Sequence, residues 1–76
     1  MEKNSIKDLV GFEIADKETP GYGETTMDEM EALAMNDGFN DLRVLADKTI
    51  ITMEYVSGRV NVWHDDKMII TSVTEG

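Results

Sequence analysis

The sequence predicts a single α+β domain over residues 1–76: one α-helix packed on a small β-sheet, with a long exposed loop between two of the strands. Three observations predict this class. A capped amphipathic segment starts at Thr26, and short runs rich in β-branched residues follow it. Two of these runs are separated by about a dozen residues without helical periodicity, which is long for a link inside a compact domain. A domain of this size buries only about 60% of the unfolded chain's surface, so its core must be small.

The chain before the helix carries weaker signals. Residues 1–7 are polar, and we expect them to be frayed. Phe12 to Ile14 alternates apolar and acidic side chains, which predicts a short strand or extended segment. The charged run 16–24 contains the proline and two of the glycines, and this composition is typical of a loop. The role of the extra segment 12–25 does not follow from the sequence.

The helix is predicted to start at Thr26. Thr26-Met27-Asp28-Glu29 is typical of a capping box, in which the threonine oxygen and the glutamate carboxylate both accept from backbone N–H groups. Four apolar residues at helical spacing form its inner face: Met27, Met30, Leu33 and Ala34. Asn36-Asp37-Gly38 ends the helix, because glycine readily adopts the left-handed conformation of a C-terminal cap. A helix of about ten residues is too short to be stable alone in water, so it must pack on the sheet.

Three strands are predicted, at residues 42–45, 59–64 and 68–73. The short link 65–67 makes the last two antiparallel, whereas the long link before residue 59 permits the first two to be parallel. We expect Phe39 and Leu42 to cover the bottom of the core.

Alternation in the strand 59–64 separates its side chains into an apolar and a polar set. One face carries Val60, Val62 and His64, and the other carries Arg59, Asn61 and Trp63. If the two valines face the helix, the second set points the opposite way and is placed to brace the preceding loop. A guanidinium group suits this task, because its rigid fork of donors fits carboxylates and carbonyl oxygens.

Residues 49–58 form the predicted loop, which we interpret as a binding loop. Its large apolar side chains are Ile50, Ile51, Met53, Tyr55 and Val56, a composition unlike that of disordered chain. An exposed, extended and partly apolar loop on a small scaffold favours a peptide that is presented to a partner. The alternative interpretation is an ordinary core strand at residues 50–53.

Ile51-Thr52-Met53-Glu54-Tyr55 followed by Arg59-Val60-x-Val62 resembles the potato inhibitor I family of serine protease inhibitors, to which chymotrypsin inhibitor 2 and eglin c belong. The resemblance extends to Gly76 and resumes upstream at Asp8-Leu9-Val10-Gly11, but scarcely covers residues 12–25. The spacing from Arg59 to Gly76 is similar to that of the bacterial and fungal elastase-inhibitor branch. This resemblance implies that the first two strands are parallel, so that the sheet is mixed.

The resemblance also implies an inhibitory mechanism. Met53 enters the primary specificity pocket of a subtilisin-like, chymotrypsin-like or elastase-like serine protease, and Met53–Glu54 is the bond presented for cleavage. The implied protease-binding loop consists of Ile50, Ile51, Thr52, Met53, Glu54, Tyr55 and Val56. Arg59 carries over as a basic brace, whereas the family's second basic position holds Asn61. From its place on the same strand face, and not from the resemblance, we expect Trp63 to support the loop as well. Members of the elastase-inhibitor branch often carry a cysteine before the last glycine, where this chain has Glu75.

Composition bounds the remaining possibilities. The net charge is −9, from 16 acidic and 7 basic residues, which argues against nucleic-acid binding. Scattered acidic positions favour a role in solubility; the alternative is an acidic mimic of nucleic acid. There is no cysteine, so the chain offers no disulfide and no thiolate ligand. No signal peptide or membrane-spanning run is visible in the sequence, and we expect a cytoplasmic monomer without a membrane partner.

No motif predicts an enzyme, a cofactor or a metal site. Gly21-x-Gly23 lacks the strand and the further residues of a phosphate loop. His64 is the single histidine, and we interpret it as structural. Asp65-Asp66 is typical of a turn stabilised by side-chain hydrogen bonds. A non-inhibitory interaction module with the same fold remains the alternative to an inhibitor.

Overall fold

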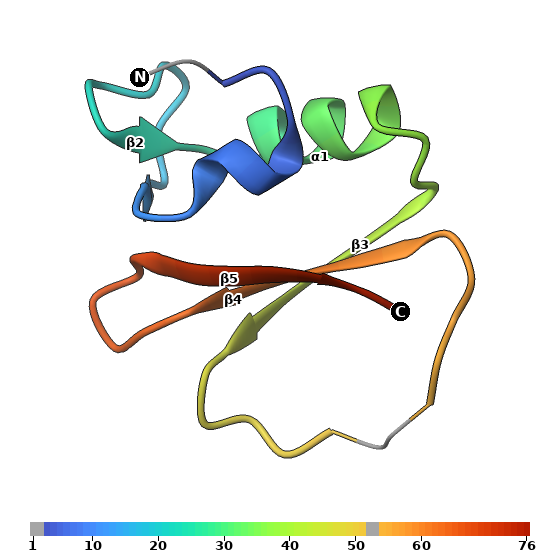
Figure 1. Cartoon of the computed structure of the whole chain (residues 1–76). Helices are drawn as coiled ribbons and strands as arrows, with labels where there is room; N and C mark the ends of the chain where they lie inside the picture. The colour runs from blue at the N-terminus through green and yellow to red at the C-terminus, as the bar shows by residue number, and fades with distance from the viewer. Residues whose placement is uncertain (1–2, 52–53) are drawn as a thin grey trace.

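The computed structural model describes residues 3–51 and 54–76 and confirms the α+β class. In chain order the elements are a 3₁₀ helix η1 (Ile6–Leu9), β1 (Glu13–Ile14), β2 (Glu24–Thr25), α1 (Met27–Asn36), β3 (Asp41–Ala46), β4 (Arg59–His64) and β5 (Ile70–Glu75). The helices and the β1–β2 pair form one layer, and the three longer strands form a second layer beneath it (Figure 1). Within the described ranges, no helix is long and apolar enough to cross a membrane.

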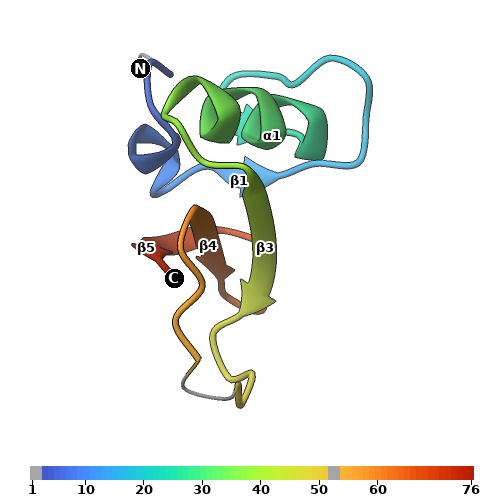
Figure 2. The ribbon, with the colours of Figure 1, turned by 90° about the vertical axis from the view of Figure 1, so that its right-hand side faces the viewer.

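The main sheet has the order β3-β4-β5. As predicted, β3 and β4 are parallel, with Asp41 opposite Arg59, and β4 and β5 are antiparallel, with Val60 opposite Glu75. A parallel pair needs a long crossover connection, which is usually a helix. Here the crossover connection is the loop 47–58, which extends from the sheet on the side away from α1 (Figure 2).

The core lies between α1 and the inner face of the sheet. Eight hydrophobic side chains are at most 3% exposed: Ile6, Leu9, Phe12, Met30, Ala34, Val60, Val62 and Ile70. The predicted facing of the two β4 valines is therefore confirmed. Phe39 and Leu42 pack against this cluster, also as predicted. Met27 differs from the prediction, because the first turn of α1 leaves its side chain 45% exposed beside Met68 in a surface hollow.

The ends of α1 follow the sequence signals with one exception. The Thr26 side chain accepts from the Glu29 N–H at 3.2 Å, which is the first half of the predicted capping box. The Glu29 carboxylate instead accepts from the Thr25 hydroxyl at 2.6 Å and pairs with Lys3 at 2.9 Å. These two donors compete successfully with the backbone N–H of the cap. At the other end Asp37 is the C-cap, and Gly38 has a φ of 93°.

The N-terminal segment is more ordered than we expected from its polarity. Ser5 and Asp8 form a capping box at the start of η1, and Ile6 is fully buried. The Ser5 hydroxyl and the Ile6 N–H donate to the Asp37 carboxylate at 2.9 and 2.8 Å. Apolar residues at i and i+3, Ile6 and Leu9, are the signal that the polar composition obscured. Of the segment 1–7, the first two residues lie outside the described part of the chain.

The extra segment 12–25 forms a second, small sheet. β1 and β2 pair in parallel, with Glu13 opposite Glu24, so the predicted extended segment is confirmed and the loop ends one residue earlier than expected. Gly11 and Phe12 exchange hydrogen bonds of 2.8 Å with Ile70, which attach this sheet to the start of β5. Lys17 pairs with Glu24 at 2.7 Å across the loop. The segment thus covers the end of the core at the start of β5.

Candidate functional site

The loop between β3 and β4 is fastened to the sheet at its beginning. The Asp47 N–H donates to the His64 carbonyl at 2.7 Å, and the Asp47 carboxylate accepts from the Thr71 hydroxyl at 2.6 Å. The Thr49 N–H donates to the Ala46 carbonyl at 2.9 Å and closes a turn. The chain therefore leaves β3 in a direction set by contacts to both other strands.

The end of the loop is fastened as well. The Asn40 N–H donates to the Gly58 carbonyl at 2.9 Å, and the Arg59 N–H donates to the Val56 carbonyl at 3.2 Å. Gly58 has a φ of 80°, and a Cβ there would lie 2.8 Å from the side-chain oxygen of Asn40. The positive φ favours glycine at the point where the loop re-enters the sheet, and any other residue would also displace the Asn40 side chain.

Arg59 connects the middle of the loop to the end of β5. Its Nη2 donates to the Glu54 carbonyl at 3.0 Å, and Nε and Nη2 donate to the main-chain oxygen of Gly76 at 3.0 and 2.6 Å. The same oxygen accepts from the Val56 N–H at 3.2 Å. Arg59 lies on the face where the sequence placed it, and among the described loop residues its side chain donates to the backbone of Glu54 rather than to the carboxylate.

Tyr55 lies against Gly76 on the outside of this junction. The aromatic ring occupies the position that a Cβ of residue 76 would take, and Gly76 has a φ of 91°. Tyr55 itself remains 71% exposed. The glycine therefore lets an exposed loop side chain pack against the end of the sheet.

Asn61 and Trp63 lie on the same face of β4 as Arg59, as predicted, but their described hydrogen bonds go to the sheet. Asn61 accepts from Arg43 Nε at 2.9 Å, and the Trp63 indole N–H donates to the Thr74 hydroxyl at 3.1 Å. We expected these two residues to support the loop directly, but neither forms a hydrogen bond to a described loop residue. Both residues line a hollow of about 240 Å³ between the sheet and the loop, together with Ile51, Glu54 and Tyr55.

The predicted binding residues are described in part. Ile50 is 98% exposed and Glu54 is exposed, while Ile51 and Val56 are half-buried. The core-strand interpretation of residues 50–53 is wrong at Ile50, which projects into solvent. Thr52 and Met53 lie outside the described residues, so the predicted scissile bond is placed only on its Glu54 side.

Comparison with known proteins adds one finding. The chain is similar to an elastase inhibitor. The solved structure of elastase inhibitor AFUEI (crystal form II) is 33% identical over 60% of this chain and 68% of that chain, with a TM-score of 0.49. No protein-family model matches the chain, and the search of curated proteins returned no match.

The other candidate groups of the sequence have structural roles. The Asp65 carboxylate accepts from the N–H groups of Lys67 and Ile69 at 2.8 and 3.0 Å, which is the predicted turn. The Ile69 hydrogen bond is the main reason that the pKa of Asp65 lies below its ordinary value. His64 Nδ1 lies 2.9 Å from the Asp65 carbonyl. Among residues 3–51 and 54–76, no group of three His, Asp or Glu side chains is placed to hold a metal ion.

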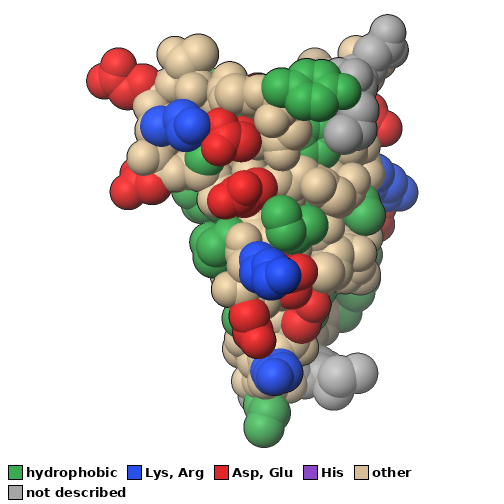
Figure 3. Space-filling view, turned by 90° about the vertical axis from the view of Figure 1, so that its left-hand side faces the viewer, with side chains coloured by type: hydrophobic (Ala, Val, Ile, Leu, Met, Phe, Trp, Pro, Cys, Tyr) green, Lys and Arg blue, Asp and Glu red, His purple; other side chains and the backbone are tan. Residues whose placement is uncertain are grey.

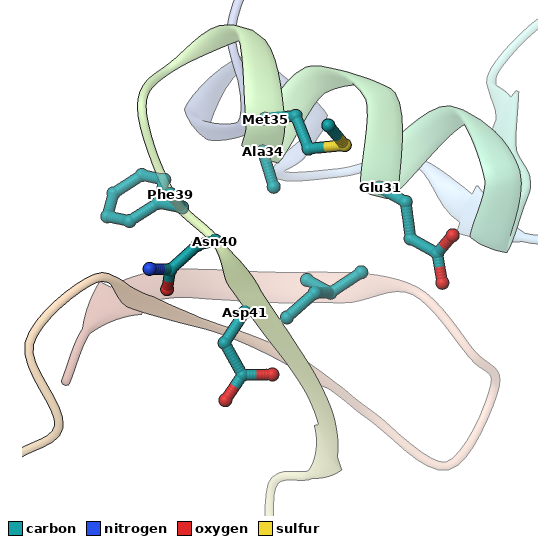
Figure 4. Close-up of a pocket in the computed structure, with 7 residues that line it drawn as sticks. Glu31, Ala34, Met35, Phe39, Asn40 and Asp41 are labelled. Carbon is teal, nitrogen blue, oxygen red and sulfur yellow. The ribbon is translucent and has the colours of Figure 1, made fainter.

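A second hollow, of about 260 Å³, lies where the end of α1 turns into β3 (Figure 4). Its apolar lining residues are Ala34, Met35, Phe39 and Leu42, and its acidic ones are Glu31 and Asp41. Asn40, which also lines it, is the residue that contacts Gly58 at the end of the loop. The hollow is therefore adjacent to the loop's attachment but is not part of the loop surface.

On the face shown in Figure 3, the acidic side chains do not form one continuous patch. Figure 3 shows carboxylate side chains interleaved with Lys and Arg along this face. Several acidic groups are also paired within the fold, as in Lys3–Glu29 and Lys17–Glu24. This distribution favours solubility over mimicry of a nucleic-acid backbone.

Proposed function

We propose that this protein is a serine protease inhibitor that inserts the loop 49–58 into the active site as a substrate would, with Met53–Glu54 as the presented bond. The observation that carries the proposal is the double hold of Arg59 on the Glu54 carbonyl and on Gly76. These hydrogen bonds join Glu54, the residue immediately after the presented bond, to the end of β5. The hydrophobic core lies on the other face of the sheet and does not depend on them. The sequence resemblance supports the choice of a serine protease as partner.

The energetic argument rests on preorganisation. Ordering one residue of backbone costs about 1–2 kcal/mol, so ordering roughly seven loop residues on binding would cost about 7–14 kcal/mol. A nanomolar complex has about 12 kcal/mol of binding free energy in total. A loop that is held before it binds avoids this cost, whereas a free loop would be cut as a substrate. The contacts of Asp47, Gly58 and Arg59 support such a prior hold.

The residue types of the loop favour an apolar specificity pocket. Met53 is a flexible unbranched apolar side chain, which suits subtilisin-like, chymotrypsin-like and elastase-like enzymes better than a pocket with an acidic floor. Ile51 and Ile50 precede it and are suited to pairing as an added strand with the enzyme. Tyr55 and Val56 follow on the other side of the presented bond. We propose that one chain occupies one enzyme as a monomer.

Titration of subtilisin, chymotrypsin and elastase with the purified chain tests the proposal. We expect at least one enzyme to lose activity stoichiometrically, with slow cleavage of the chain in the loop seen by mass spectrometry. Rapid cleavage without loss of enzyme activity would show that the loop is a substrate and would overturn the proposal.

The second candidate function is a non-inhibitory interaction module. The observation in its favour is the exposure of Ile50 and Tyr55, which offers an apolar contact to any partner of suitable shape. The two functions differ in whether binding requires a free active site on the enzyme. An inhibitor must lose its binding when the enzyme's active site is already blocked by a covalent small-molecule inhibitor, whereas an interaction module binds blocked and free enzyme equally.

A further inference from the structure

We propose that Arg43, on β3, is a second positioning residue for the binding loop and acts on the Glu54 carboxylate across the hollow beneath the loop. This inference rests on the proposed function. It assigns to the strand before the loop a role that the sequence analysis gave only to the strand after it.

The first observation is the way in which Arg43 is held. The parallel register places Arg43 opposite Asn61, and Asn61 opposite Thr74 of β5. Arg43 Nε donates to Asn61 Oδ1 at 2.9 Å, and the Asn61 amide contacts the Thr74 hydroxyl at 3.5 Å. Asn61 is only 4% exposed, so its amide oxygen is a fixed acceptor. The guanidinium is therefore oriented from one side by a buried partner.

The second observation is what the rest of the guanidinium faces. Arg43 lines the hollow of about 240 Å³ together with Glu54 and Tyr55 of the loop. Within the described parts of the chain, its two terminal nitrogens have no hydrogen-bond partner, and no carboxylate lies within ion-pair distance of them. An oriented fork, whose two terminal donors make no hydrogen bond to a described residue, thus lies beside a loop that carries a carboxylate. Such a group attracts Glu54 in the free protein and can form a direct ion pair with it when an enzyme presses on the loop.

Two carboxylates border this hollow, and strand geometry selects between them. Glu75 is opposite Val60 in the β4–β5 ladder, so its side chain belongs to the face of the buried valines. Arg43, Asn61 and Thr74 share the other face. Glu54 is already held to this region through its carbonyl by Arg59, so its side chain stays close to the hollow. Glu54 is therefore the partner that the geometry favours.

The experiment is a double-mutant cycle in the full chain, using chymotrypsin and subtilisin as the enzymes. Arg43→Gln is combined with Glu54→Gln and, separately, with Glu75→Gln. The matched control is Lys48→Gln, which removes the same charge at an 89% exposed position with only a 4.0 Å contact to Asp66. We expect Arg43→Gln to weaken inhibition about three- to tenfold and to lose this effect in the Glu54→Gln background. Arg43→Lys should recover part of the loss, because it restores the charge without the fork.

A second measurement is independent of any enzyme. Amide hydrogen exchange at Tyr55 and Val56, followed by NMR in the free protein, should be faster in Arg43→Gln than in Lys48→Gln, with similar melting temperatures. If the wild-type chain inhibits neither enzyme, the proposed function fails, and this exchange comparison still decides whether Arg43 restrains the loop. Equal effects of Arg43→Gln and Lys48→Gln, or coupling to Glu75 with none to Glu54, would overturn the inference.

Discussion

Arg59 and Gly76 are joined by three hydrogen bonds that run in both directions. The Gly76 N–H donates to the Arg59 carbonyl at 2.8 Å, and the Arg59 side chain donates twice to the main-chain oxygen of Gly76, at 3.0 and 2.6 Å. Because the same guanidinium also reaches the Glu54 carbonyl, the end of β5 and the middle of the loop are held by one side chain. The loop's conformation is therefore coupled to the edge of the sheet.

Replacing Arg59 with alanine should free the loop without unfolding the domain. The arginine lies on the face of β4 opposite the buried valines, so the core is untouched. We expect a loss of about 1–2 kcal/mol in the free energy of unfolding from the missing charge-assisted hydrogen bonds. Inhibition should weaken and cleavage between Met53 and Glu54 should accelerate, as seen by mass spectrometry. Lys48→Ala is the control, and a globally unfolded Arg59→Ala protein would show that the arginine belongs to the core.

Replacing Gly76 with alanine should displace Tyr55. The added methyl group would occupy space that the tyrosine ring fills, and the φ of 91° is strained for any residue with a side chain. We expect weaker inhibition and faster loop cleavage. The double variant Gly76→Ala/Tyr55→Ala relieves the clash but not the backbone strain, so it should be cut more slowly than the sum of the two single variants predicts. Strict additivity in cleavage rates would mean that the two residues do not interact.

Replacing Met53 with lysine should change the preferred enzyme. Burying a large apolar side chain is worth about 1.5–3 kcal/mol, so inhibition of subtilisin-like or chymotrypsin-like enzymes should weaken roughly ten- to a hundredfold. Inhibition of trypsin should improve, because its pocket has an acidic floor. Inhibition constants for the three enzymes provide the measurement. If none of the three constants changes, Met53 does not occupy the primary pocket.

Salt should change inhibition by no more than the roughly three- to tenfold effect expected of the Arg43–Glu54 attraction. Contacts made by apolar side chains and backbone are not screened, whereas attraction between exposed charges falls off within about 8–10 Å at moderate ionic strength. We therefore expect inhibition constants at low and moderate salt to differ by less than about tenfold, despite the net charge of −9. A nucleic-acid mimic would lose its partner over the same range. Binding to a basic DNA-binding protein that collapses with salt, without protease inhibition, would favour the mimic.

Glu29 should make the domain sensitive to acid. Burial acts to raise the pKa of Glu29, but hydrogen bonds from Thr25 and Lys3 and the Lys3 charge outweigh it and leave the pKa below its ordinary value of 4.5. Since the folded pKa is the lower one, the stabilisation by the ionised carboxylate is fully present above about pH 4.5 and is lost as the pH falls through the folded pKa.

Thermal unfolding of Glu29→Gln tests this dependence. The difference in melting temperature between wild type and Glu29→Gln should be largest near neutral pH and should shrink as the pH falls below about 4.5. Glu31→Gln is the control, because Glu31 is exposed on the same helix and pairs with no described residue. A difference between wild type and Glu29→Gln that stays constant with pH would mean that the carboxylate's charge is not what stabilises the fold.

Much of the fold could be predicted because its signals are local. The Thr26 cap, the glycine after α1 and the alternation in β4 each depend on a few neighbouring residues, and each element lies where those signals placed it. The predictions were wrong where residues distant in the sequence form hydrogen bonds or ion pairs with a local group. Lys3 and Thr25 capture the Glu29 carboxylate, and Asp37 orders the segment at Ser5. Neither interaction is visible to a local pattern.

The candidate site divides in the same way. Arg59 could be placed on the brace face from alternation alone, and its contact with the chain at Glu54 follows from proximity in the sequence. Arg43 and Gly76 could not, because their nearness to Asn61 and Tyr55 depends on the register of two different strand pairs. If β3 and β4 are parallel and Asp41 lies opposite Arg59, Arg43 must lie opposite Asn61.

The use of the loop as the crossover between β3 and β4 has a consequence for a nicked protein. A cut inside the loop leaves one piece with both helices and β3 and another with β4 and β5, and the central strand of the sheet belongs to the second piece. Five of the eight buried core residues belong to the first piece and three to the second, so we expect the two pieces to stay associated after the bond is broken. In such an assembly the new ends would stay near each other at high local concentration instead of diffusing away. We therefore expect an enzyme that cuts the loop to remain bound to a folded assembly of the two pieces.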